Sequence, residues 1–339
     1  MKVPGSIRFT FAPNMTICRL PVGMWQVSGA HGPIDPAAAI RSLFDHFDAG
    51  FTTFDLADHY GPAEDFIGEF RRQLVAQRGT DSLTNLQAFT KWVPRPGRMT
   101  RAVVEQAMDR SHRRMGVAAL DLLQFHWWDY ADANYLDALR HLADLQAEGR
   151  IRHLALTNFD TEHLRTICDA GIKIVSNQVQ YSLIDQRPEV RMVPFCQQRG
   201  ITLLTYGTVC GGLLSERYLG KPEPGRHELT TASLQKYKQM IDAWGGWGLF
   251  QDLLRVLANI ALKYRVSIAN VAVRSILYGP AVAGVIVGCR LGVSEHIADN
   301  VQLFRFELDD EDRGGMDAVT RKGRNLFELI GDCGEEYRG

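Results

Sequence analysis

The sequence has few of the features that mark secreted, membrane-spanning or disulfide-built proteins. Its 339 residues contain only six cysteines, and no two of them stand at the close spacing of a metal or redox motif. No apolar run approaches the length of a membrane span, and residues 1–20 contain no continuous apolar stretch. We therefore expect reduced thiols in a cytoplasmic protein with no membrane partner.

The chain also lacks an excess of charge of either sign. Its formal net charge is −1 and it has no basic run, which argues against nucleic acid as a partner. None of the ten histidines forms a His-x-His pair, so a metal-dependent barrel hydrolase is excluded and no metal site is expected. With 45% hydrophobic and 23% charged residues, the composition is that of a globular protein with a substantial core.

Strand-like apolar runs alternate with helix-like amphipathic segments along almost the whole chain. The predicted strands are Ile17–Val27, Phe51–Asp55, Leu86–Lys91, Ala119–His126, Ile151–Thr157, Ile172–Val179, Ile201–Tyr206 and Ala283–Gly288. The predicted helices are Pro36–Ala49, Ala63–Ala76, Arg101–Met115, Tyr135–Glu148, Thr161–Ala170, Pro188–Arg199, Gln251–Tyr264 and Ile268–Leu277. Glycine follows several helices just before the next strand, as at Gly50 and Gly200, where a left-handed residue ends a helix.

Eight such repeats predict a single-domain (β/α)8 TIM barrel over residues 1–339. A doubly wound open sheet would usually carry Gly-x-Gly-x-x-Gly after its first strand, and residues 23–29 lack that spacing. Two regions interrupt the alternation. We expect Gly211–Gly248 to be a long, functional loop after strand seven. The tail predicts one amphipathic helix from Asp309 to about Ile330.

Four polar residues, Asp55, Tyr60, Lys91 and His126, stand at or just after the ends of successive predicted strands. In a parallel barrel these ends meet on the catalytic face. An ammonium beside a phenol favours the phenolate and lowers the phenol pKa from its usual value of about 10. Lys91 would supply that charge and Asp55 would hold Lys91. The cluster therefore indicates a tuned acid suited to carbonyl reduction.

Each of these residues also has an ordinary structural interpretation. Asp55 alone would be a cap, Tyr60 a packing residue and His126 a core histidine. Lys91 is harder to explain, because a buried ammonium without a partner is costly. Their joint placement at strand ends favours a functional cluster.

The segments Phe54–Gly61, Thr90-Lys91 and Gln124-Phe125-His126 resemble the catalytic segments of the aldo-keto reductases. The resemblance continues through Thr157-Asn158-Phe159, Asn177–Ser182, Tyr206-Gly207, Gly211–Leu214 and Ile297–Asn300, and so covers nearly the whole chain in the family's order. It implies reversible hydride transfer between NADPH and an aldehyde or ketone. Tyr60 would be the general acid in reduction and the base in oxidation, while His126 would orient the carbonyl or share the proton.

The resemblance also implies where the cofactor binds. Thr157, Asn158 and Gln178 would hydrogen-bond the nicotinamide carboxamide, Tyr206 with Gly207 would stack on the nicotinamide, and Gly211 with Leu213 would face the pyrophosphate. The adenosine end would use Gly288, Arg290, His296 and Asn300. Where the family often has an arginine that binds the 2′-phosphate, this chain has His296. Arg290 could supply the positive charge of that missing arginine. We expect NADPH, with NADH possible.

Four tryptophans, Trp25, Trp92, Trp127 and Trp128, end or follow predicted strands and could line an apolar substrate pocket or simply pack in the core. The expected partner is a small carbonyl compound, and the oligomeric state stays open.

A second class of function is also compatible with the resemblance. Barrels of this kind can serve as NADPH-binding regulatory subunits of potassium channels, acting as sensors with little turnover. The complete set of four polar residues favours catalysis.

Overall fold

A computed structural model of the chain describes residues 7–338. Its strands are β1 (Arg8–Ala12), β2 (Met15–Cys18), β3 (Val22–Gly23), β4 (Thr53–Asp55), β5 (Gln87–Trp92), β6 (Leu120–Phe125), β7 (Ile151–Thr157), β8 (Ser176–Gln180), β9 (Thr202–Tyr206), β10 (Val282–Val285) and β11 (Val287–Gly288). Its helices are α1 (Pro36–Ala49), α2 (Ala63–Arg78), α3 (Arg101–Met115), α4 (Tyr135–Ala147), α5 (Thr161–Asp169), α6 (Arg187–Val190), α7 (Met192–Arg199), α8 (Ala232–Trp244), α9 (Gly246–Tyr264), α10 (Ile268–Leu277), α11 (Ile297–Gln302), α12 (Asp310–Thr320) and α13 (Leu326–Ile330).

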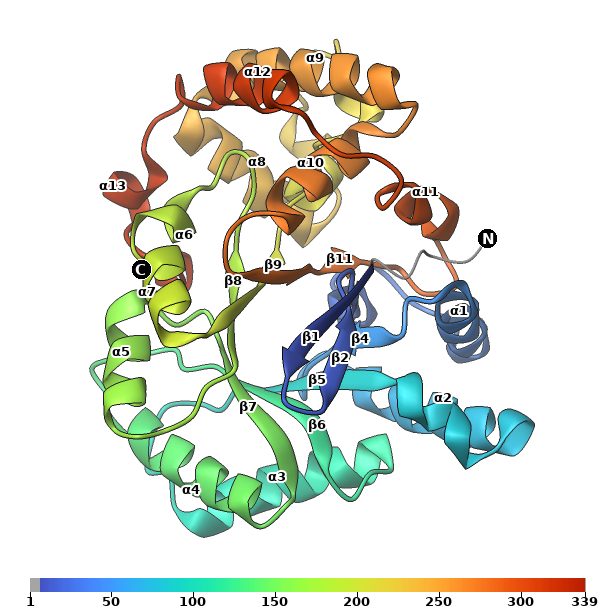
Figure 1. The fold of residues 1–339 in the computed structure, drawn as a ribbon, viewed down its shortest axis with the longest axis vertical. Coiled ribbons are helices and arrows are strands. Elements are labelled where there is room, and N and C mark those ends of the chain that lie inside the picture. Colours follow the sequence, from blue (N-terminus) through green and yellow to red (C-terminus); the bar gives the residue numbers. More distant parts are fainter. Residues whose placement is uncertain (1–6, 339) are drawn as a thin grey trace.

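A parallel barrel organises the molecule. Within the described residues, nine strands pair in the order β10-β9-β8-β7-β6-β5-β4-β3-β11. Only Ile286 separates β10 from β11, and these two strands pair with β9 and β3 at opposite ends of that order. Together they are the predicted eighth strand, and they close the ring. The helices lie outside the strands in Figure 1. The prediction of a (β/α)8 barrel is confirmed.

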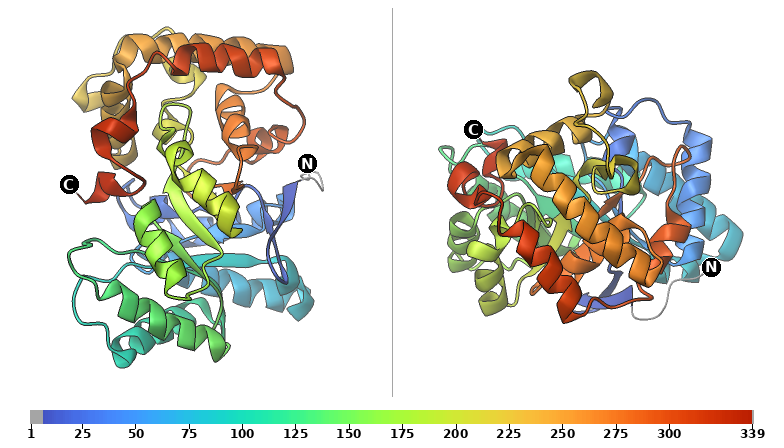
Figure 2. Two further views of the ribbon diagram at one scale, coloured as in Figure 1. Left: turned by 60° about the vertical axis from the view of Figure 1, so that its left-hand side comes forward. Right: turned by 90° about the horizontal axis from the view of Figure 1, so that it is seen from above.

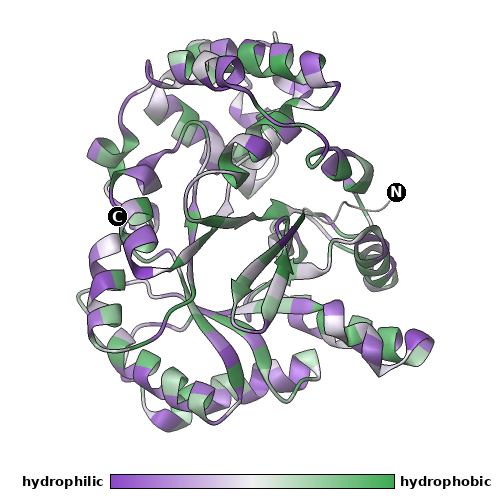
Figure 3. Cartoon of the chain, viewed as in Figure 1, coloured by the Kyte–Doolittle hydropathy of each residue, from purple (hydrophilic) through white to green (hydrophobic). Residues whose placement is uncertain are grey.

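Local sequence accounts for the helix boundaries. Helix α1 begins after Asp35, whose side chain accepts a hydrogen bond from the Ala38 N–H, and it has Pro36 at its first position. It ends at Gly50, with φ of 102°. Gly200 ends α7 in the same left-handed conformation. Figure 3 shows apolar and polar residues alternating along these helices, whose apolar faces cover the barrel.

The first predicted strand, Ile17–Val27, is wrong in its extent. Residues Arg8–Cys18 form the antiparallel hairpin β1–β2, and the barrel strand β3 covers only Val22–Gly23. The hairpin side chains Phe11 and Ile17 belong to the apolar cluster inside the barrel, where the Phe11 ring stacks on Phe89 at 5.6 Å. The hairpin therefore fills one end of the barrel.

The predicted loop Gly211–Gly248 is also wrong as a loop. It contains helix α8 and the start of α9. With α10 and α12, these helices bury a second apolar cluster that includes Trp244, Phe250 and Met316, and they form a layer beside the barrel (Figure 2). The predicted tail helix is divided in two, because the turn at residues 321–325 separates α12 from α13.

Among the described residues, no single helix has both the length and the hydropathy of a membrane span. Helices α9 and α10 reach this length and hydropathy only when they are taken together, and the chain bends by 93° between them.

Candidate active site

The structure brings the four predicted catalytic residues to the carboxyl ends of neighbouring strands. Asp55 ends β4, Lys91 lies near the end of β5, and Tyr60 lies in the turn between β4 and α2. The Lys91 Nζ atom is 2.5 Å from Asp55 Oδ2 and 5.1 Å from the centroid of the Tyr60 ring. His126 follows β6, and its backbone N–H donates to the carbonyl of Trp92, the residue after Lys91.

Asp55 is held by more groups than the sequence indicated. Its second carboxylate oxygen, Oδ1, accepts hydrogen bonds at 2.8 Å from the amide nitrogens of both Gln124 and Gln178. The Gln178 amide nitrogen also donates to Gln124 Oε1 at 2.7 Å. Gln178 was expected to reach the nicotinamide, but its amide nitrogen is bound within the barrel. Gln124 was not predicted, although it lies two residues before His126.

Burial determines the protonation of Lys91 and Tyr60. Removal from water lowers the pKa of Lys91 against the raising effect of Asp55. Burial and then the negative charge of Asp55 raise the pKa of Tyr60 well above its ordinary value. The sequence had suggested a lowered pKa for this phenol. The physical reason for the difference is that burial disfavours the charged phenolate and the negative charge of Asp55 disfavours it further, so the phenol keeps its proton at neutral pH.

His126 is neutral and has a defined tautomer. Burial lowers its pKa to about 4. Its Nδ1 atom is 3.0 Å from the backbone carbonyl of Thr157, and because a carbonyl can only accept, Nδ1 carries the proton. Among the described residues, the buried Nε2 atom has no hydrogen-bond partner. This atom is therefore an acceptor, whereas orienting a carbonyl oxygen would require a donor.

The four tryptophans divide into two groups. Trp25 and Trp128 are exposed, and their rings lie 5.1 Å from Tyr60 and 4.4 Å from His126 respectively. These two are placed to form walls beside the predicted catalytic residues. Trp92 is buried, and Trp127 is wholly buried with its Nε1 donating to backbone carbonyls at Asp129 and Asp132. Trp127 is accordingly a core residue.

The residues expected at the nicotinamide lie at the ends of β7 and β9. The buried Thr157 hydroxyl oxygen has no partner among the described residues. Asn158, in the left-handed region with φ of 57°, accepts a 2.8 Å hydrogen bond on Oδ1 from the Tyr206 hydroxyl. Thr157 therefore has unused hydrogen-bonding capacity at the place where a carboxamide is expected.

Helix α8 packs closely on the loop expected to face the pyrophosphate. A Cβ atom on Gly207 would lie 2.4 Å from the Tyr237 hydroxyl, and one on Gly211 would lie 3.0 Å from the Ser233 backbone. Only glycine permits this approach. Leu213 is fully buried.

The adenosine-end residues separate into two places. Gly288, His296 and Asn300 line a small hollow near the barrel rim. Arg290 does not line this hollow and lies beside Gly32. One of its guanidinium nitrogens would be 3.4 Å from a Cβ atom placed on Gly32. Its buried Nε atom has no hydrogen-bond partner in residues 7–338. That unpaired donor is suited to a phosphate oxygen.

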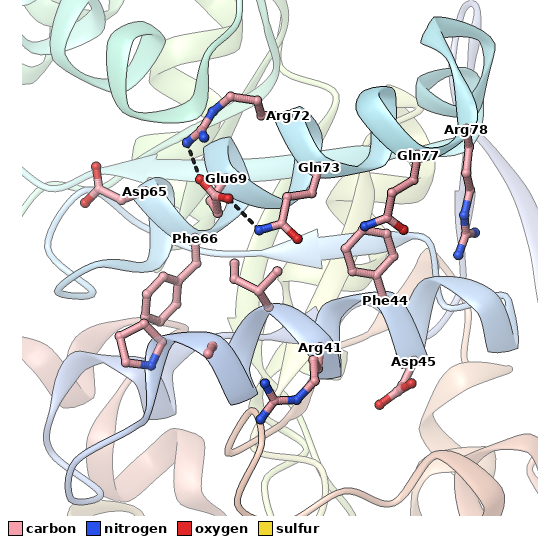
Figure 4. A pocket seen from close by; sticks show the side chains of 13 residues that line it. Arg41, Phe44, Asp45, Asp65, Phe66, Glu69, Arg72, Gln73, Gln77 and Arg78 are labelled. Atoms are coloured by element: carbon pink, nitrogen blue, oxygen red, sulfur yellow. Dashed lines mark hydrogen bonds and ion pairs between the residues drawn. The ribbon is translucent and has the colours of Figure 1, made fainter.

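A larger groove lies between α1 and α2, and its lining includes Arg41, Phe44, Glu69 and Arg78 (Figure 4). It contains none of the predicted site residues.

Three further polar residues near the site, Lys236, Glu336 and Tyr337, were missed by sequence reasoning. Lys236 lies on α8, and the other two lie in the short turn Glu335–Tyr337 near the C-terminus.

Comparison with known proteins identifies the family. The model of the aldo/keto reductase family matches residues 19–321. The chain is 26% identical over 300 residues to flagellar radial spoke protein 5 of Chlamydomonas reinhardtii, covering 71% of this chain and 57% of that protein. It is 21% identical to the NADH-specific methylglyoxal reductase of Escherichia coli K12, covering 88% and 93% of the two chains. For the L-glyceraldehyde 3-phosphate reductase of Escherichia coli O157:H7 the identity is 24%, with 96% and 95% covered.

Solved structures show the same fold. The glycerol dehydrogenase of Gluconobacter oxydans superimposes with a TM-score of 0.76 at 20% identity, over 97% of this chain and 98% of that one. A Bombyx mori aldo-keto reductase in complex with NADP gives a TM-score of 0.68 at 20% identity, over 94% and 93%. Aldo-keto reductases are oxidoreductases that reduce carbonyl groups with NADP(H). This chain belongs to the aldo/keto reductase family.

Proposed function

We propose that the chain is an NADPH-dependent reductase that reversibly converts an aldehyde or ketone to an alcohol, with Tyr60 as the general acid and base. The observation that carries this proposal is the buried Lys91–Asp55 ion pair beside the Tyr60 ring. A buried ion pair is costly to form and contributes little to stability on average. Its position beside a phenol at the strand ends gives it a chemical use.

NADPH, when bound, supplies the hydride that adds to the carbonyl carbon. The carbonyl oxygen then gains negative charge and needs a proton. Tyr60 holds its proton at neutral pH and can give it to that oxygen. Lys91, whose ammonium lies 5.1 Å from the centroid of the Tyr60 ring, would stabilise the phenolate left behind, and Asp55 fixes the position of Lys91. In alcohol oxidation the proton moves in the opposite direction.

Unpaired polar atoms support binding of a dinucleotide. The Thr157 hydroxyl is suited to the carboxamide, the Tyr206 ring to stacking, and the Arg290 guanidinium to a phosphate. The relatives differ in their cofactor, since one is named as NADH-specific and another was solved with NADP. We infer NADPH because Arg290, in the segment expected to bind the adenosine end, has a buried donor with no partner within residues 7–338.

The substrate side is bounded by Trp25 and Trp128, next to Tyr60 and His126. The relatives' names specify small oxygenated carbonyl compounds, methylglyoxal and L-glyceraldehyde 3-phosphate. We therefore infer that the partner is a small-molecule carbonyl compound.

Mixing the protein with NADPH and a panel of small aldehydes tests the proposal. Loss of the nicotinamide absorbance over many turnovers is the expected result, with loss of turnover in Tyr60→Phe. A single oxidation equal to the amount of protein, unchanged in Tyr60→Phe, would instead support the cofactor-binding sensor.

A further inference from the structure

The segment before the C-terminus is docked firmly against the ends of the barrel strands. Glu336 forms a 2.9 Å ion pair with Arg187, whose side chain is 1% exposed and also pairs with Asp185 at 2.8 Å. The backbone at Gly334 approaches Asn158 so closely that a Cβ would lie 2.1 Å from the Asn158 carbonyl oxygen. These contacts fix the turn Glu335–Tyr337, which lies near the end of the chain in Figure 1.

This docking brings Tyr337 to the predicted active site. The Tyr206 hydroxyl is 3.1 Å from the Tyr337 hydroxyl, and the Lys236 ammonium donates to that same Tyr337 oxygen. The Tyr337 ring lies 6.4 Å from the His126 ring, nearly perpendicular to it. Tyr337 and Lys236 thus form a second phenol–ammonium pair beside the first.

Lys236 has further hydrogen-bonding capacity. Its Nζ atom lies 4.2 Å from the centroid of the Tyr337 ring and 5.5 Å from those of Tyr206 and Tyr237. Within residues 7–338 no carboxylate lies within 4.0 Å of this ammonium. An ammonium has three N–H donors, of which Tyr337 uses one. The remaining donors can bind an oxygen atom of a ligand.

His126 offers the complementary group, because its buried Nε2 atom is an acceptor with no partner in the described part of the chain. A hydroxyl group both accepts and donates, so it satisfies both sets of partners. A carboxylate fits less well, since it cannot donate to Nε2. The surrounding charge also favours a neutral group. Arg187 pairs with Asp185 and Glu336, and the charge of Lys236 acts on Glu336 from beyond ion-pair distance, so two cations balance two carboxylates.

We propose that Tyr337 and Lys236 determine specificity for carbonyl substrates with a hydroxyl on the carbon next to the carbonyl. That hydroxyl would accept from the Lys236–Tyr337 pair and donate to His126 Nε2, while the carbonyl oxygen faces Tyr60. The inference rests on the proposed function and names its substrate class.

The test compares two aldehydes of nearly equal shape, 2-hydroxypropanal and 2-methylpropanal, with NADPH. The variants are Tyr337→Phe, which keeps the ring, and Lys236→Met, which keeps much of the chain length. Matched controls are Tyr264→Phe, on the outer helix α9, and Lys322→Met, which is exposed. For each, kcat and KM are measured separately.

We expect the unchanged protein to prefer 2-hydroxypropanal in kcat/KM by about 10- to 100-fold, because a site with hydrogen-bonding groups discriminates against the analogue that lacks the hydroxyl. Tyr337→Phe and Lys236→Met should remove most of that preference through KM for 2-hydroxypropanal, with 2-methylpropanal nearly unaffected. The control variants should keep the preference.

Three results would overturn the inference. Equal use of both aldehydes by the unchanged protein would do so while leaving the proposed function intact. Equal losses for both aldehydes in both variants would show that the pair is structural only, and full retention of the preference would show that it does not contact substrate. Reduction of neither aldehyde, nor of any in a wider panel, would instead reject the proposed function, and the inference with it.

Discussion

Lys91 Nζ lies 2.5 Å from Asp55 Oδ2, and the two side chains are only 3% and 4% exposed. Burial lowers the pKa of Lys91, and Asp55 is the group that opposes this shift most strongly. The Asp55 carboxylate in turn has Gln124 and Gln178 on its other oxygen. The geometry of the predicted catalytic residues and the local stability are therefore set by the same contacts.

Replacement of Lys91 by methionine should destabilise the protein strongly. It leaves the Asp55 carboxylate buried without a counter-charge, which costs about 3–5 kcal/mol in free energy of unfolding. The double variant Lys91→Met/Asp55→Asn should recover a large part of that loss. Urea denaturation measures both. As the control, Arg140→Met removes an exposed pair with Asp137 and should cost less than about 1 kcal/mol. An equal effect of Lys91→Met and Arg140→Met would contradict the buried pair.

Stability should fall as pH is lowered because of His126. Its pKa is about 4 in the folded protein and about 6.5 in the unfolded chain, so between these values the unfolded chain binds more protons. The contribution is fully present above pH 6.5 and decreases by up to about 1.4 kcal/mol per pH unit towards pH 4. Denaturation of the unchanged protein and of His126→Gln at pH 7.5 and 5.0 isolates this effect. His126→Gln should lose less stability on acidification; an identical loss in both proteins would exclude the lowered pKa.

Arg290 should govern the choice between NADPH and NADH. Its buried Nε has no partner in the described part of the chain, and a bond to a phosphate is worth about 1.5–3 kcal/mol. Arg290→Met should therefore weaken NADPH binding by about tenfold or more and leave NADH binding nearly unchanged. Cofactor fluorescence titrations measure both affinities. His296→Ala, at the separate hollow, serves as the comparison. If Arg290→Met weakened both cofactors equally, Arg290 would not contact the 2′-phosphate.

The sequence predicted the barrel because its signals were local and regular. Polar residues after apolar runs marked strand ends, so Asp55 and Lys91 were placed together before their distance was known. Gly50 and Gly200 marked helix ends, where the structure shows positive φ. The hairpin Arg8–Cys18 was missed, because only its last two residues fell within the predicted strand Ile17–Val27 and no element was assigned to the residues before them. Helix α8 had a usable signal, with Thr231 as cap and buried Tyr237, Ile241 and Trp244 at helical spacing.

The tail contacts could not be predicted from local patterns. Glu336 and Tyr337 lie in a polar segment with no periodicity, and their partners Arg187 and Tyr206 are more than a hundred residues away in sequence. The pKa of Tyr60 was predicted in the wrong direction for a similar reason. The shift depends on how deeply the phenol is buried and how close the Asp55 carboxylate lies to it, which only three-dimensional packing determines.

In the proposed reaction a hydride reaches the carbonyl carbon while Tyr60 supplies the proton. Single-turnover reduction with NADPH carrying deuterium at the transferred position tests this most directly. We expect one deuterium on the former carbonyl carbon of the alcohol. Formation of that product should be slower by about 100-fold or more in Tyr60→Phe, with unchanged NADPH affinity. An alcohol without deuterium, or Tyr60→Phe reacting at the unchanged rate, would contradict the proposed reaction.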